Sequence, residues 1–250
     1  MSKAETITIP AKDLSGSRLR CLMLTSLPEN HVAKVLSLLV SPLATVDETK
    51  HHWMPGGFLN PAEAKLGECS AFLTPELREH LTSWWLKVPK RANTPNWDLV
   101  STCDIGGRDG LILVEAKAHD TEERPEGKAP GNEENHQQIH SAISDANLAL
   151  NDICLGWAIT RDSHYQLCNR FAWAWKVASL GVPVVLVYLG FLHADEMSRC
   201  GKPFSSGQEW RALIMDRGTK LVPEAAWERR LQTGGAPMWA TIRTLDLKWE

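Results

Sequence analysis

Residues 110–119, GLILVEAKAH, limit the possible folds of this chain more than any other segment. Four consecutive apolar residues are typical of a strand that is covered on both faces, yet the run ends in Glu115, Ala116 and Lys117. Side chains alternate between the faces of a strand, so Glu115 and Lys117 point the same way, about 6.6 Å apart at the usual rise. The sequence therefore predicts an acid and a base on one face at the end of a buried strand.

A second strand-like run precedes the first at residues 97–105, WDLVSTCDI, and the glycine-bearing turn GGRDG joins the two. This pattern predicts an antiparallel hairpin. Because the chain reverses direction, Asp98 at the start of one strand lies beside Glu115 and Lys117 at the end of the other. Two neighbouring carboxylates repel unless a cation lies between them, which predicts a hard divalent metal such as Mg²⁺ or Mn²⁺. Lys117 could then orient the attacking water or help to remove its proton.

The segments around the hairpin predict an α/β layer, in which helices pack against a mixed central sheet. Residues up to about 27 show no clear period. Helical spacing and capping residues predict helices at 29–40, 60–86, 135–153, 162–181 and 207–216, with another near 223–231. In the second of these, Asn60 is the expected cap and Thr74 the expected restart. Strands are predicted at 182–192, an unbroken apolar run, and at 238–249.

Charge and cysteine content exclude some classes of protein. The formal net charge of −3 argues against a generally basic nucleic-acid binder, although a local basic groove stays open. The acidic residues 119–134 are expected to form a solvated loop.

Six scattered cysteines, with no C-x-x-C pair and no secretory leader before them, predict reduced thiols and a cytoplasmic location. The apolar run 177–192 is short for a membrane span and contains Gly181 and Pro183, so we expect no membrane association.

The segment NWDLVSTCDIGGRDGLILVEAKAH resembles the signature of the PD-(D/E)xK nuclease superfamily, which has the restriction-endonuclease-like fold. The resemblance implies a helix, a three-stranded antiparallel meander, a second helix and a further strand. It also implies that Asp98 and Glu115 are metal ligands, that the carbonyl of Ala116 adds a ligand, and that Lys117 positions the attacking water. Trp97 stands where the name of the motif has proline.

The same resemblance implies two accessory residues. Many members of the superfamily have a glutamate on the first core helix that points at the metal. Glu68 is the first choice for this metal-binding glutamate, with Glu63 and Glu79 as rivals. Many members also have a catalytic glutamine at the start of the second core helix. Gln166 fits this position because the apolar strand follows directly, and Gln138 fits less well.

The resemblance covers roughly residues 60–192 and suggests three regions. These are an N-terminal helical or extended region at 1–58, a nuclease-like core at 59–192, and a C-terminal extension packed on the core at 193–250. The predicted activity is metal-dependent hydrolysis of phosphodiester bonds in nucleic acid. DNA is favoured as the substrate by the resemblance alone, and a homodimer is left open.

Several alternatives compete with this interpretation. The chain could be a non-catalytic nucleic-acid-binding or assembly protein that retains the fold, or a metal-dependent hydrolase of a small phosphorylated compound.

For Glu115 and Lys117 the simplest alternative is a solvated ion pair at an exposed strand end, which contributes little to stability. His136 and His140 lie one helical turn apart, a spacing that can bind zinc, but no third ligand completes a motif, so we expect a solvated helix face.

Overall fold

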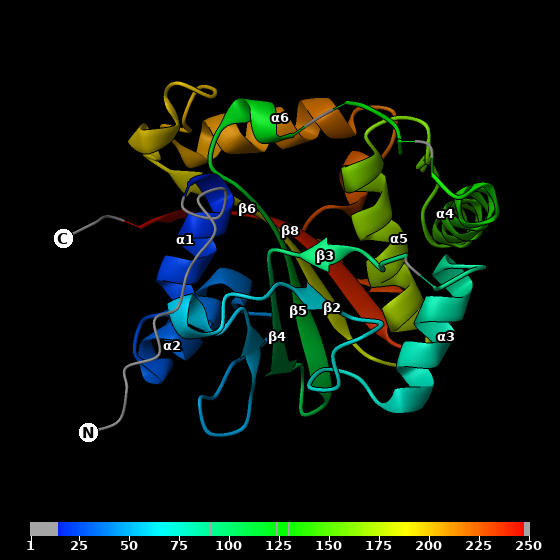
Figure 1. The fold of residues 1–250 in the computed structure, drawn as a ribbon, viewed down its shortest axis with the longest axis horizontal. Helices are drawn as coiled ribbons and strands as arrows, with labels where there is room; N and C mark the ends of the chain where they lie inside the picture. The colour runs from blue at the N-terminus through cyan, green and yellow to red at the C-terminus, as the bar shows by residue number, and fades with distance from the viewer. Residues whose placement is uncertain (1–14, 91, 124, 130, 248–250) are drawn as a thin grey trace.

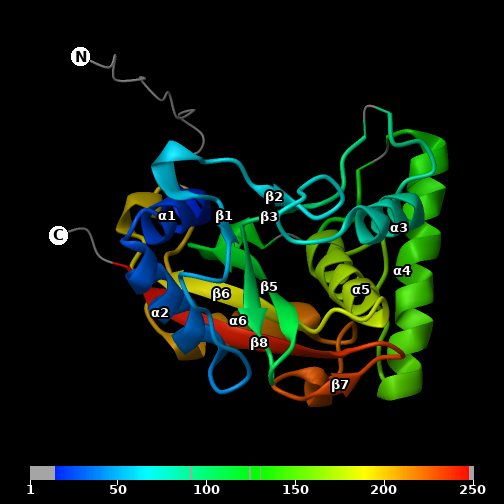
Figure 2. The ribbon, with the colours of Figure 1, turned by 90° about the horizontal axis from the view of Figure 1, so that it is seen from below.

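The computed structural model describes residues 15–90, 92–123, 125–129 and 131–247. At its centre is a mixed six-stranded sheet in the order β1-β4-β5-β6-β8-β7. Helices cover both faces of this sheet: α1 and α2 lie on one side, and α3, α4 and α5 gather on the other (Figure 1). The view from below shows the same two groups of helices on either side of the strands (Figure 2). The predicted α/β class with a mixed central sheet is thus confirmed.

The strands of the main sheet are β1 (Trp53–Met54), β4 (Leu99–Asp104), β5 (Asp109–Lys117), β6 (Val184–Leu192), β7 (Leu231–Gln232) and β8 (Pro237–Asp246). A separate ribbon pairs β2 (Ala64–Lys65) with β3 (Asn96–Trp97). The α-helices are α1 (Gly16–Thr25), α2 (Glu29–Val40), α3 (Pro75–Trp85), α4 (Glu133–Ile153), α5 (Tyr165–Ser179) and α6 (Gly207–Gly218). Short 3-10 helices lie at Gly57–Leu59, Asp120–Glu122, Asp195–Met197 and Glu224–Ala226.

The predicted hairpin is present as β4 and β5. Its antiparallel register runs from Leu99 opposite Val114 to Asp104 opposite Asp109. The turn contains Gly106 and Gly107, whose φ angles of 62° and 80° lie in the left-handed region that glycine adopts without strain. Strand β6 then adds parallel to β5, and β8 adds parallel to β6. The strand expected at 182–192 therefore lies within the sheet.

Strand β5 is buried on both faces, which explains its continuous apolar sequence. Leu111 and Leu113 contribute to the core beneath α4 and α5. Ile112, Val114 and Ala116 contribute to the second core, beneath α1 and α2. By alternation, Glu115 faces the same side as Leu113, toward α5. The same pattern places Lys117 on that side.

The helix predicted over 60–86 is wrong in its first half. Only Pro75–Trp85 is helical, and the Thr74 side chain caps it by accepting a hydrogen bond from the Leu77 N–H. Asn60 forms a bridge with Gly56 instead of capping a helix. The segment that follows pairs as β2 with β3, so tertiary pairing overrides the local helical preference.

The sequence predicts no particular helix at the position of α1, because residues up to about 27 show no clear period, and Arg20 lies among the apolar residues of this helix. That arginine is buried, and it donates hydrogen bonds to Glu196 and to the carbonyl of Leu247. The helix predicted near 223–231 is also wrong: Glu224–Ala226 is a 3-10 turn and Leu231–Gln232 is strand β7.

The sheet extends beyond the predicted core region. Strand β1 comes from the N-terminal region, and β7 and β8 come from the C-terminal region, so all three predicted regions contribute strands. The segment 177–192 forms the end of α5, a turn and β6. Of the helices in the described part of the chain, none has the length and apolar content that crossing a bilayer requires.

Candidate active site

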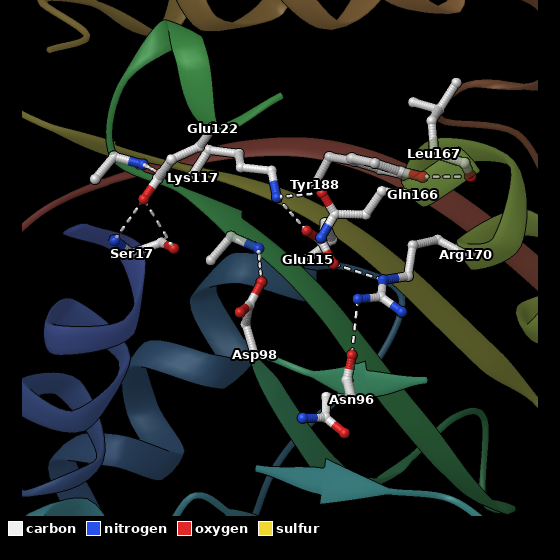
Figure 3. A network of polar contacts seen from close by, with 12 residues as sticks. Ser17, Asn96, Asp98, Glu115, Lys117, Glu122, Gln166, Leu167, Arg170 and Tyr188 are labelled. Carbon is white, nitrogen blue, oxygen red and sulfur yellow. Dashed lines mark hydrogen bonds and ion pairs between the residues drawn. The ribbon is translucent and has the colours of Figure 1, made fainter. Parts of the chain in front are cut away.

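Asp98 lies where the chain passes from the β2–β3 ribbon into the main sheet. The ladder between β4 and β5 ends at Leu99 and Val114, so no strand residue of β4 pairs with the last three residues of β5. The Asp98 carboxylate occupies this position and accepts a hydrogen bond from the Ala116 N–H at 2.7 Å (Figure 3). The sequence thus brings Asp98 directly against the residue between Glu115 and Lys117.

Glu115 and Lys117 point into the protein beside α5 (Figure 3). Their exposed fractions are only 1% and 4%, and the two side chains form an ion pair. The Lys117 ammonium also donates to Gln166 Oε1 at 2.8 Å. An exposed, solvated ion pair is therefore the wrong description of these two residues. Gln166, in the first turn of α5, lies at the site as predicted, whereas Gln138 hydrogen-bonds to the Trp84 carbonyl on α3.

Arg170 is a buried member of the site that the sequence interpretation missed. Its Nε donates to the second carboxylate oxygen of Glu115. One of its terminal nitrogens donates to the Asn96 carbonyl at 2.7 Å, and the guanidinium lies 4.5 Å from the centre of the Trp97 ring. Arg170 follows Gln166 by one helical turn on α5, a spacing that could have indicated a shared face.

Burial and the neighbouring charges shift the pKa values of the two carboxylates, Asp98 and Glu115, in opposite directions. Burial, together with the neighbouring Glu115 charge, raises the pKa of Asp98 to about 7. Burial would also raise the pKa of Glu115, but Arg170 and Lys117 hold it below its ordinary value. Burial opposes the charge of Lys117, yet the carboxylates of Glu115 and Asp98 raise its pKa. The structure thus favours a charged Glu115 and a charged Lys117 beside a more easily protonated Asp98.

The acidic segment after β5 is only in part the solvated loop that the sequence predicts: the described residues from 125 to 132 are mostly exposed, whereas Glu122 and Glu123 pack against the protein. The Glu122 carboxylate accepts hydrogen bonds from the N–H groups of Ser17 and Ala118, which joins the segment to the start of α1. Glu123 is 2% exposed, and its carboxylate has no hydrogen-bond partner among the described residues. Burial raises the pKa of Glu123 to about 7, and the nearby charge of Lys117 opposes that rise. No local pattern distinguishes this glutamate from its exposed neighbours.

The predicted accessory glutamate requires correction. Glu68, the first choice, is exposed in a turn and forms an ion pair with Lys65, because the segment before Thr74 is not helical. Glu79 lies on α3 with its side chain exposed. Glu63 lines the same pocket as Asp98, and it accepts a hydrogen bond from the Asn96 amide at 2.7 Å. Of the three candidates, Glu63 is the one that the structure brings to the site.

The fit to a metal ion depends on a small set of oxygen donors. Among the residues that the structure describes, no group of three or more His, Cys, Asp or Glu side chains is arranged to hold a metal ion. His136 and His140 on α4 belong to no such group. The donors at the sheet edge are the carboxylates of Asp98 and Glu115 and the carbonyl of Ala116. In a strand the N–H and C=O of one residue face the same neighbour, so this carbonyl leaves the strand on the Asp98 side.

Such a donor set fits a hard cation that keeps most of its ligands as water or substrate. Mg²⁺ is commonly held in this way, through one or two carboxylates together with phosphate oxygens. Thiolate and imidazole ligands, which would indicate zinc, are not part of the set.

Comparison of the chain with protein-family models, with curated proteins and with solved structures finds no match. The residues of the candidate site are acids and bases held at the end of a buried strand, beside a pocket that Asp98 lines.

Proposed function

We propose that this protein is a metal-dependent nuclease of the PD-(D/E)xK type, which hydrolyses phosphodiester bonds of DNA by means of an activated water. The observation that carries the proposal is the contact between Asp98 and the Ala116 N–H, which places Asp98 beside Glu115 and Lys117. The three motif residues are separated by up to 19 positions, and they meet at one end of the hairpin. The choice of DNA rests on the sequence resemblance.

The order of elements supports a restriction-endonuclease-like fold. In chain order, α1, then β1, β4 and β5, then α5 and β6 follow the implied sequence of a helix, three antiparallel strands, a helix and a strand. In this alignment the first core helix is α1 rather than a helix within 60–86. Helix α1 contains no acidic residue, so an accessory glutamate would come from elsewhere, and Glu63 is our candidate.

In the proposed mechanism Asp98, Glu115 and the Ala116 carbonyl would hold Mg²⁺ or Mn²⁺. When bound, such an ion stabilises charge on the reacting phosphate and increases the acidity of water. Lys117 donates to both Glu115 and Gln166, so its ammonium acts as a hydrogen-bond donor in this arrangement. One further N–H remains to orient the attacking water or a phosphate oxygen. Lys117 is thus better suited to orienting the water than to removing its proton.

A pair of matched variants tests the proposal. Asp98→Asn keeps an oxygen that can accept the Ala116 hydrogen bond but removes the charge, while Asp104→Asn makes the same change at the opposite end of β4. Asp104 accepts a hydrogen bond from the turn at Gly107, a contact that asparagine also makes. We expect Asp98→Asn to lower Mg²⁺-dependent DNA cleavage by about two to three orders of magnitude, and Asp104→Asn to retain it.

Lys117→Ala and Glu115→Ala extend the test to the other two motif residues. We expect both to lose cleavage. Circular dichroism should accompany each assay, because Glu115→Ala leaves Arg170 without its carboxylate partner. If folded Asp98→Asn or Lys117→Ala protein cuts DNA as fast as the parent, the proposed site is wrong.

A non-catalytic nucleic-acid-binding or assembly protein with this fold is the second candidate, and one observation favours it. Both carboxylate oxygens of Glu115 are already engaged, one by Lys117 and the other by Arg170. Calorimetric titration with Mg²⁺, in the presence and absence of DNA, separates the two functions. Heat of metal binding that disappears in Asp98→Asn supports the nuclease. No binding of Mg²⁺ under either condition supports the binding protein.

A further inference from the structure

A pocket of about 380 Å³ opens directly from the proposed metal site. Asp98 forms part of its wall, together with residues from the β2–β3 ribbon and from the start of α5. Its size is at the lower end of the roughly 300–1,000 Å³ range of ligand pockets, which suits one nucleotide better than a stack of base pairs. A group bound here would lie next to a phosphate held at Asp98.

The chemistry of the pocket suits a nucleobase. Tyr165, in the first turn of α5, lines it with a half-buried ring, and the buried Trp85 and Ile139 add apolar surface. Bases that are not paired commonly stack on aromatic side chains and form hydrogen bonds along their edges. The lining thus provides an aromatic side chain, Tyr165, for contact with a base.

Three asparagine amides line the same pocket and can read the edge of a base. Asn96 uses one amide donor on Glu63, and Asn93 uses its oxygen to accept from Lys65. The oxygen of Asn169 accepts from its neighbour on α5. Each side-chain amide offers two donors and one oxygen acceptor, and the bonds formed within the described part of the chain leave all three with donors for a ligand.

Lys128 supplies a positive charge at the same pocket. Its ammonium lies 5.3 Å from the centre of the Tyr165 ring, and it forms no ion pair with any described residue. Burial lowers the pKa of Lys128, which is the expected result when a cation loses water without gaining a carboxylate partner. An anion beside Tyr165 would provide that partner, and in a nucleotide the phosphate is the group that does so.

We propose that this pocket binds one unpaired nucleotide next to the scissile phosphate, with its base against Tyr165 and its phosphate at Lys128. The substrate is then single-stranded or frayed DNA rather than continuous duplex, because a paired base is stacked and its edge is already occupied. The inference rests on the proposed nuclease function, which places the scissile phosphate at Asp98. It adds a substrate class and two binding residues to that function.

Metal-free binding tests the pocket without any cleavage step. The probe is a single-stranded oligonucleotide that carries one 2-aminopurine, compared with the same strand in a fully paired duplex and with an abasic version. In EDTA and at one fixed salt concentration, we expect the single strand to bind about tenfold more tightly than the duplex or the abasic strand. The 2-aminopurine fluorescence should change on binding as the base moves from its neighbours onto Tyr165.

Matched variants assign the effect to the two residues. We expect Tyr165→Leu and Lys128→Gln each to weaken single-strand binding by about tenfold, and Tyr165→Phe to preserve it. Lys34→Gln is the control for charge, since Lys34 is exposed on α2, on the opposite face of the sheet. If Tyr165→Leu fails to fold, Lys128→Gln and the abasic strand still decide the question.

The outcomes separate this inference from the nuclease proposal. Equal affinity for duplex, single strand and abasic strand would overturn the pocket inference, even if the protein cleaves DNA. Selective binding that depends on Tyr165, without any Mg²⁺-dependent cleavage, would keep the pocket and reject the nuclease. A free nucleoside monophosphate that binds as tightly as the oligonucleotide would also overturn the inference, and would indicate a small phosphorylated substrate.

Discussion

Replacing Arg170 with methionine tests whether the buried ion pair with Glu115 holds the site together. Methionine fills a similar volume but removes the salt bridge, the hydrogen bond to the Asn96 carbonyl and the contact with the Trp97 ring. Removing one partner of a buried ion pair costs about 3–5 kcal/mol. Lys117 still contacts the other oxygen of Glu115, so we expect the lower end of that range, about 3 kcal/mol.

Urea unfolding followed by tryptophan fluorescence measures this loss. With a slope of about 2–3 kcal/mol per molar urea, the midpoint should fall by roughly 1–1.5 M. Arg199→Met is the matched control. Because Arg199 is exposed, the urea midpoint of this variant should equal that of the parent. The double variant Glu115→Gln/Arg170→Met should lose less than the sum of the single variants, with a coupling of roughly 1–3 kcal/mol. A midpoint for Arg170→Met within about 0.3 M of the parent would refute the reasoning.

Two further predictions concern regions outside the site. Hydrogen bonds from Lys202 and Ser205 lower the pKa of Glu209 from 4.5 to about 2. The charged Glu209 therefore stabilises the folded protein above pH 4.5, the pKa of this group in the unfolded chain, and this contribution is lost as the pH falls toward 2. The Tm difference between the parent and Glu209→Gln should therefore shrink below about pH 4.5, and a constant difference would contradict the assignment. In Gly190→Ala, the new Cβ would lie 2.5 Å from the Trp210 ring. This overpacking should cost about 1–3 kcal/mol and lower Tm by roughly 2–4 °C per kcal/mol, so an unchanged Tm in calorimetry would contradict it.

The parts of the fold that the sequence predicts well are those fixed by local patterns. The β4–β5 hairpin follows from two apolar runs and a glycine turn, and its register then brings Asp98 to the end of β5 without further information. Helix α2 matches its predicted bounds because its apolar residues follow one helical period. Gln166 lies in the first turn of the helix that precedes β6, as the sequence predicts, because the apolar run of β6 identifies that helix.

The parts that the sequence could not predict depend on contacts between distant residues. Arg170 joins Glu115 across 55 positions. The buried Arg20 of α1 has its partners far along the chain, at Glu196 and at the carbonyls of His193 and Leu247. Glu63 replaces Glu68 at the site because the segment between them pairs as a strand instead of forming a helix. No periodicity within the segment carries that information.

The β2–β3 ribbon shares no ladder with the main sheet, although Asp98 follows it directly. Substitutions at Asn93 or Asn96 would therefore reshape the mouth of the pocket and leave the β4–β5 register unchanged. In the proposed nuclease, a scaffold of this kind would let substrate preference diverge among descendants while the residues proposed for the chemistry stay in place.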